Sequence, residues 1–173
     1  KEKHSFSPAL YDLTALQQEA NQRYGYSAKQ TLNIMQRLYE NHKVLTYPRT
    51  DSRYLTEDMV GTLKERLQSC AVGPYKRVAL KLANKPIKAN KSFVNNKKVS
   101  DHHAIIPTEQ FVQLENMSNE ERKIYDMVVR RFLAVLCPAS EYEDTTVTAS
   151  YNNETFLAKG TIYKTPGWRE VYE

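Results

Sequence analysis

Apolar residues recur at helical spacing through most of the first 137 positions. Thr14 and Ser27 each precede a glutamine by three positions, which is the capping-box pattern at the start of a helix. We therefore expect one helix over about 15–24, ended by Gly25, and a second from Ser27 onward. Two capped helices joined at a glycine form either a helix-turn-helix unit or a plain helical corner. The second helix is expected to turn these residues inward: Thr31, Leu32, Met35, Leu38 and Tyr39.

Three further helices are predicted downstream. Thr56 should cap the first of them and Pro74 should open the second. A third capping box, at Ser118, predicts the longest helix, over about 119–136. The stretch 84–100 contains five lysines and four asparagines, so we expect a loop there.

The pattern changes after Pro138, where β-branched or aromatic residues alternate with polar ones. Asn152 and Asn153 separate two such runs, which predicts a short β-hairpin with its turn at the asparagines. Because two strands alone are not stable in water, this hairpin needs a sheet from elsewhere in the chain or in a parent protein. The predicted fold class is mainly α (α+β), with helices over 1–137 and strands over 138–173.

Composition adds few constraints. The 25 lysines and arginines exceed the 20 acidic residues by 5, which permits an anionic partner without requiring one. Cys70 and Cys137 lie in apolar helical patterns, so we expect reduced core thiols, which suits a cytoplasmic protein. The first residues are polar and unlike a signal peptide, and no apolar run approaches the ~18 residues of a membrane span. We expect no membrane partner, and a chain that is a piece of something longer.

The stretch KVLTYPRTDSRYL, at 43–55, is the first candidate for chemistry. Pro48 disfavours a helical conformation for Tyr47, so an extended segment is expected at 44–49. Residues two apart in an extended segment point to the same side, so Tyr47 and Arg49 should share a face. A phenol, with its pKa of about 10, becomes a nucleophile where cations stabilise the developing charge. A guanidinium beside it suits attack on a phosphodiester. The alternative is a strand-end tyrosine beside a solvated arginine.

A second stretch, VSDHHAIIPTE at 99–109, contains paired histidines. A histidine here can donate to a phosphate oxygen or exchange a proton with a leaving sugar hydroxyl. Adjacent residues of an extended segment face opposite ways, so only one of His102 and His103 should reach a phosphate. The alternative is one buried, hydrogen-bonded histidine and one exposed. Zinc is disfavoured, because no cysteine lies nearby and His4 and His42 show no ligand spacing.

Together, LTYPRTDSRYL and SDHHAIIPT resemble the active-site tyrosine region of type IA DNA topoisomerases, and the HHAIIPT form is most similar to the bacterial topoisomerase III branch. The upstream block LYDLTALQQEANQRYGYSAKQTLNIMQRLYE and the tail GTIYKTPGWREVY are similar to the same family. The resemblance covers nearly the whole chain, with several blocks in the right order.

The resemblance implies an enzyme in which Tyr47 attacks a single DNA strand and forms a transient 5′-phosphotyrosyl link. That link would allow strand passage, relaxation or decatenation, and religation. Arg49 and His102, not His103, match the family's catalytic arginine and histidine. Further residues are expected to contact DNA, Gln36 by its match to a family glutamine and the others as polar groups of the turn: Gln36, Thr50, Asp51, Ser52 and Arg53.

The resemblance also implies a domain organisation. Residues 1–137 would form the tyrosine-bearing domain III, with a catabolite-activator-like helix-turn-helix fold, and 138–173 a partial strand segment of domain II. The family's Toprim domain holds Mg²⁺ through a glutamate and an Asp-x-Asp element, and this chain has no Asp-x-Asp. The Toprim domain and domain IV are therefore expected to be absent, with no metal or cofactor held here. The expected partners are single-stranded DNA and the remaining domains of the parent enzyme, in a cytoplasmic, nucleoid-associated location, and the chain alone is expected to be inactive.

Two other functions compete with this interpretation. A non-catalytic helix-turn-helix DNA-binding module would be unaffected by Tyr47→Phe. A tyrosine recombinase would need several basic residues grouped around the tyrosine, and only Arg49 and Arg53 lie close to it in the sequence.

Overall fold

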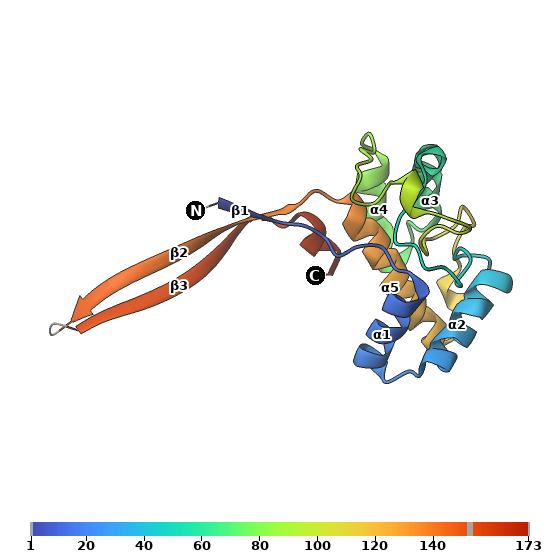
Figure 1. Ribbon diagram of the computed structural model, residues 1–173, viewed down its shortest axis with the longest axis horizontal. Coiled ribbons are helices and arrows are strands. Elements are labelled where there is room, and N and C mark those ends of the chain that lie inside the picture. Colours follow the sequence, from blue (N-terminus) through green and yellow to red (C-terminus); the bar gives the residue numbers. More distant parts are fainter. Residues whose placement is uncertain (1, 152–153, 173) are drawn as a thin grey trace.

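The computed structural model describes residues 2–151 and 154–172. Figure 1 shows a helical body from which a long β-hairpin arm extends. The arm consists of two antiparallel strands, β2 (Ser140–Tyr151) and β3 (Glu154–Thr165). The strands expected after Pro138 are thus confirmed, although at 12 residues each they make the hairpin long rather than short. The expected turn at Asn152 and Asn153 lies outside the described residues.

The N-terminus supplies a third strand to the arm. β1 (Glu2–Ser5) pairs antiparallel with the base of β2, which gives the strand order β1-β2-β3. These residues had been assigned to the helical segment, so part of the sheet that the hairpin needed comes from the opposite end of the same chain. After β3 the chain returns to the body, where the 3₁₀ turn η5 (Gly167–Tyr172) packs against the last helix. The division of the chain between two parent domains stays a prediction.

The longest helix is the axis of the body. α5 (Asn119–Leu136) packs against α2 (Ala28–Glu40) and α4 (Lys76–Ala83). α1 (Leu13–Tyr24) covers α2, and α3 (Leu63–Ser69) covers α4, as Figure 1 shows around the central helix. Short 3₁₀ turns connect these helices: η1 (Glu57–Thr62), η2 (Gly73–Tyr75), η3 (Asn96–Lys98) and η4 (Leu114–Asn116).

The start of α1 differs from the prediction. Asp12, not Thr14, is the N-cap, and its carboxylate accepts a hydrogen bond from the Ala15 N–H at 2.8 Å. The other carboxylate oxygen pairs with Arg53 at 3.3 Å, so a contact from a distant loop holds the aspartate at the helix start. Gly25 ends the helix as predicted, at φ 71°, a left-handed conformation that glycine adopts without steric cost.

The caps of α2 and α5 follow the sequence more closely. Ser27 accepts from the Gln30 N–H at 3.0 Å, but the Gln30 side chain bonds to Glu120 instead of returning to Ser27. Ser118 and Glu121 make both bonds of a capping box. The inward face of α2 is shifted by one position: Thr31, Ile34, Met35 and Leu38 are buried, whereas Leu32 and Tyr39 are half-buried. The α1–α2 pair has the order of a helix-turn-helix, and that specific fold remains a prediction.

The helix predicted after Thr56 is divided into η1 and α3, and the Thr56 side chain makes no capping bond. Pro74 lies in η2, directly before α4, as expected. Cys70 is buried and Cys137 half-buried, both as free thiols. Burial raises their pKa values, to about 12 for Cys70 and about 11 for Cys137. Among the described residues, no helix is both long and apolar enough to cross a bilayer.

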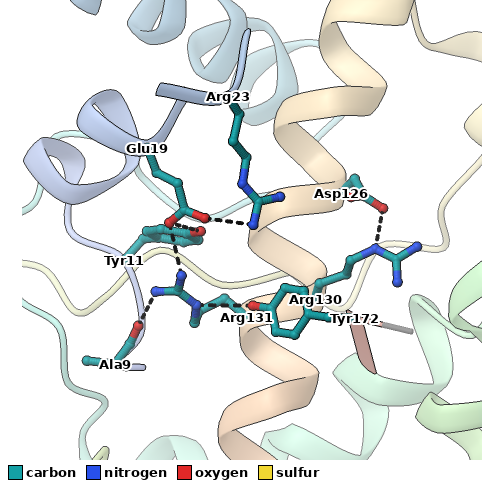
Figure 2. Close-up of polar contacts among 8 residues, drawn as sticks. All are labelled: Ala9, Tyr11, Glu19, Arg23, Asp126, Arg130, Arg131 and Tyr172. Carbon is teal, nitrogen blue, oxygen red and sulfur yellow. Dashed lines mark hydrogen bonds and ion pairs between the residues drawn. The ribbon is translucent and has the colours of Figure 1, made fainter. Parts of the chain in front are cut away.

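A polar network ties both chain ends to the body (Figure 2). Glu19 of α1 accepts from the Tyr11 hydroxyl at 2.6 Å and pairs with Arg131 of α5 at 2.9 Å. The same guanidinium donates to the Ala9 carbonyl at 2.9 Å and to the Tyr172 hydroxyl at 3.2 Å. Burial raises the pKa of Tyr11, so its hydroxyl stays a donor. One arginine of α5 therefore fixes where the N-terminal segment, α1 and the C-terminal turn meet.

Candidate functional site

A ladder of backbone hydrogen bonds joins the two motif stretches. The Thr46 N–H donates to the Ile106 carbonyl at 3.0 Å, and Leu45 pairs antiparallel with Pro107. Below this bridge, the Ala104 N–H donates to the Tyr54 carbonyl at 2.9 Å. The predicted extended segment at 44–49 is thus present as an isolated bridge rather than as a strand, and its partner is the segment after the paired histidines.

The ladder brings the Tyr47 ring against His102. Their ring centroids are 4.2 Å apart and the planes are inclined by 30°, so the two rings stack. On its other side, Tyr47 meets the edge of Tyr39, from the last turn of α2, at 5.4 Å and 80°. Tyr47 is half-buried and His102 exposed. Two neighbouring rings therefore restrict the orientation of the phenol while the histidine remains open to a ligand.

Tyr47 lines a hollow of about 720 Å³. Its charged and titratable wall comes from several elements: Glu40, Lys43, Arg66, His102, His103 and Glu109. Arg49 lines a second hollow of about 380 Å³, together with Asp51, Ser100 and Asp101. His102 borders both hollows. The expected single face for Tyr47 and Arg49 is therefore wrong: the chain bends at Pro48, and the two side chains line neighbouring hollows that meet at His102.

Thr50 and Ser52 are internal braces of the site. Thr50 is 7% exposed, and its hydroxyl donates to the His102 carbonyl at 3.1 Å and accepts from the Ser52 N–H at 3.2 Å. The Ser52 hydroxyl donates to the Lys98 carbonyl at 2.8 Å and accepts from the Tyr54 N–H at 3.1 Å. These hydroxyls hold the tyrosine loop to the histidine loop, and a direct contact of either with DNA stays a prediction.

The remaining predicted contacts differ in availability. Arg49 and Asp51 are exposed, and their side chains make no hydrogen bond or ion pair with any described residue. Arg53 pairs with Asp12, as described above. The Gln36 amide donates to Glu40 at 2.8 Å, while its carbonyl oxygen is buried without a partner among the described residues.

His103 is anchored within its own loop. It is half-buried, and Nδ1 lies 2.6 Å from the Ala104 carbonyl, which can only accept, so Nδ1 is the donor. Burial lowers the pKa of His103, and the charges of Arg66 and His102 lower it further, which favours the neutral imidazole. The expected hydrogen bond within the loop is confirmed. The expected division of faces is not, because both histidines line the larger hollow.

A buried carboxylate lies beneath the chain that enters the site. Glu121 of α5 pairs with Arg37 of α2 at 3.0 Å and with His42 at 3.2 Å. Burial by itself would raise the pKa of Glu121, but hydrogen bonds from the Ser118 backbone and Arg37, with the charge of His42, lower it. The next residue, Lys43, has φ 58°, which turns the chain from α2 toward Tyr47.

The whole chain matches a known family. The family model described as DNA topoisomerase matches residues 1–173. The chain belongs to this family. The resemblance to type IA topoisomerases, and to the topoisomerase III branch, is thereby confirmed. DNA topoisomerase 3 of Bacillus thuringiensis (strain Al Hakam) is 64% identical over 173 residues, which is 100% of this chain and 24% of that protein. DNA topoisomerase 3 of Bacillus subtilis (strain 168) is 54% identical over 171 residues, 99% of this chain and 24% of that protein.

The fold matches a solved topoisomerase. Full-length topoisomerase I from Thermotoga maritima, in a monoclinic crystal form, superposes with a TM-score of 0.70 and covers 100% of this chain and 28% of that chain. At 24% identity this likeness concerns the fold alone. The chain therefore spans about a quarter of the length of its topoisomerase relatives.

Three residues of this topoisomerase site were missed as site residues by the sequence analysis. Tyr39 was counted as a helix-core residue, Arg66 lies on α3 outside both motifs, and Lys43 is a turn residue. No local pattern distinguishes them, because each reaches the hollow through the packing of α2 and α3 beside the two loops. Among the described residues, no group of three or more His, Cys, Asp or Glu side chains is placed to hold a metal ion.

Proposed function

We propose that this chain carries the DNA-cleaving tyrosine of a type IA topoisomerase of the topoisomerase III kind, and that Tyr47 is the nucleophile. The observation that carries the proposal is the stack of Tyr47 on His102, two aromatic side chains from distant motifs at 4.2 Å beside an open hollow. The substrate is a single DNA strand, which the parent enzyme cleaves, passes and religates in relaxation or decatenation. The motif residues of a tyrosine recombinase's cationic cluster are not gathered here, since Arg53 is paired with Asp12.

The reaction exchanges one phosphate ester for another. The Tyr47 oxygen bonds to phosphorus, the bond from phosphorus to the 3′ oxygen breaks, and the phenolic proton is balanced by protonation of the leaving 3′ hydroxyl. The phosphate remains on the 5′ end of the cut strand, joined to tyrosine. Religation is the reverse attack by the 3′ hydroxyl, so neither an oxidant nor an energy donor is needed.

The neighbouring side chains have distinct parts in this reaction. Arg49 has an unengaged guanidinium, whose planar fork suits two parallel hydrogen bonds to phosphate oxygens. His102 borders the hollows of both Tyr47 and Arg49, so its imidazole is placed to hydrogen-bond the phosphate or the leaving oxygen. The residues present do not form a magnesium site, so no step here passes through a metal. We expect magnesium to be held by the Toprim domain of the parent enzyme, and this chain alone to be inactive in relaxation.

Peptide mapping of the covalent adduct tests the proposal. The parent enzyme is incubated with labelled single-stranded DNA, the adduct is trapped by denaturation, and the modified peptide is sequenced. We expect the nucleotide on Tyr47 and no adduct in Tyr47→Phe. Tyr54→Phe, in the same loop, is the matched control and should form adduct normally. An adduct on Tyr54, or a normal yield from Tyr47→Phe, would overturn the assignment and favour a non-catalytic DNA-binding module.

A further inference from the structure

The positive charge of the chain is concentrated in one segment. From Arg66 to Ser100 there are nine lysines and arginines and no aspartate or glutamate. Since the chain has 25 cationic and 20 acidic residues, the remainder has 16 cationic residues against 20 acidic ones and is net negative. This segment therefore accounts for the whole positive charge. Solubility alone does not require such segregation, which is typical of a surface for an anionic partner.

Some of these cations are used by the fold. Arg66 lies 3.6 Å from Glu109, and Arg77 and Lys81 both pair with Glu170, the latter at 3.2 Å. The others are exposed lysines, and none of their ammonium groups pairs with a described residue: Lys76, Lys85, Lys88, Lys91, Lys97 and Lys98. The last five lie in the loop between α4 and the histidine motif, and we call them the lysine loop.

The lysine loop is fastened to the tyrosine loop. The Leu55 N–H donates to the Phe93 carbonyl at 2.7 Å, and the Asn95 N–H donates back to the Leu55 carbonyl at 2.9 Å. Ser52 donates to the Lys98 carbonyl at 2.8 Å, which holds the end of the lysine loop beside the site. The Phe93 side chain is buried, at 2% exposure, and anchors the middle of the loop. Its ammonium groups are thus displayed from a held backbone.

The end of the lysine loop leads into the smaller hollow. Lys98 is followed within four positions by Ser100, Asp101 and His102, which line that hollow with Arg49. A strand whose scissile phosphate lies at Arg49 and His102 would have its neighbouring phosphates close to Lys97 and Lys98. Successive phosphates of one strand form a row of single charges, and lysine binds such charges without reading the bases.

We propose that the lysine loop is a sequence-independent binding surface for the phosphate backbone of the DNA strand beside the cleavage site. The identity of that strand rests on the proposed function, whereas the surface itself does not. Single-stranded nucleic acid is favoured as partner because the loop is joined to the tyrosine loop by three backbone and side-chain hydrogen bonds.

Salt-dependent binding tests this surface. The 173-residue chain with Tyr47→Phe, which cannot cleave, is titrated against a fluorescent oligothymidine at several NaCl concentrations, with anisotropy as the readout. Two double variants are compared with it, Lys97→Gln with Lys98→Gln, and Lys85→Gln with Lys88→Gln. Each lost phosphate contact should lower the slope of log K against log salt by about 0.7, hence by about 1.4 for a pair, and a pair should weaken binding roughly 10-fold or more at 0.1 M salt.

A matched control removes the same charge elsewhere. Lys29 and Lys123 are exposed at the end of the body where Gln30 hydrogen-bonds Glu120, and neither lies in the lysine loop. Lys29→Gln with Lys123→Gln should leave the salt slope unchanged. Circular dichroism of every variant confirms that a weaker signal is not loss of the fold.

The outcomes separate this inference from the proposed function. Native slopes in both loop variants, or an equal loss in the control, would overturn the lysine loop as a DNA surface even if Tyr47 forms an adduct. Loop variants that lose binding to phosphatidylserine vesicles while keeping native DNA slopes would replace the nucleic acid by a membrane surface. A reduced slope without an adduct on Tyr47 would support the loop and overturn the nucleophile.

Discussion

Thr50 is where the structural role and the DNA-contact role give opposite expectations. Thr50→Val keeps the shape of the side chain and removes a hydroxyl that bonds both the His102 carbonyl and the Ser52 N–H. Ser52 is only 4% exposed, so its N–H loses its partner in a buried position. An unsatisfied buried polar group costs about 1–3 kcal/mol, and we therefore expect the free energy of unfolding to fall by roughly 2 kcal/mol.

Urea unfolding followed by far-UV circular dichroism measures this loss. With an m value of about 2 kcal/mol/M, the midpoint should move down by about 1 M. Thr50→Ser keeps the hydroxyl and loses one methyl group, so it should cost only about 1 kcal/mol. In the parent enzyme, Thr50→Val should also slow adduct formation, because the bond that holds His102 beside Tyr47 is lost. A valine variant of native stability that no longer binds oligothymidine would refute this reasoning and make the hydroxyl a DNA contact.

Four further predictions address the site. Arg49→Lys in the parent enzyme should cleave roughly a hundredfold more slowly, since a lysine lacks the fork that holds phosphate; a native rate would leave only a general electrostatic role. His102→Ala should lower the cleavage rate by about 10²–10⁴-fold with little change in melting temperature, whereas His103→Ala should affect melting more than rate, and rate assays beside thermal melts would expose a reversal. Tyr39→Phe should keep the cleavage rate and Tyr39→Leu should reduce it, because only the ring contacts Tyr47; equal rates in single-turnover cleavage would contradict a positioning role. The lowered pKa of Glu121 means that its stabilisation is present above the unfolded value near 4.5 and is lost as pH falls through the folded value; the stability difference from Glu121→Gln should therefore shrink in urea titrations below pH 4, and a constant difference would count against the ion pairs.

Much of the helical body was predictable because its signals are local. The cap at Ser27, the capping box at Ser118 and the left-handed Gly25 each depend on bonds within a few residues, which a single sequence contains. The alternation after Pro138 likewise predicted the two strands of the arm, because side chains of a strand alternate between faces. The motif residues Tyr47 and His102 were also predicted to act together, from their resemblance to a family rather than from their spacing.

Only the tertiary structure decided the contacts between distant segments. Thr14 and Asp12 are both suitable helix caps, and the ion pair with Arg53 accompanies the choice of Asp12. β1 has no partner nearby in sequence, and its pairing with β2 brings together residues about 140 positions apart. The bend at Pro48 placed Tyr47 and Arg49 in different hollows, against the rule for extended chains. The sequence by itself therefore determined the elements and the reactive residues. Their arrangement depends on burial and long-range hydrogen bonds, whose energies arise only once the chain is closed on itself.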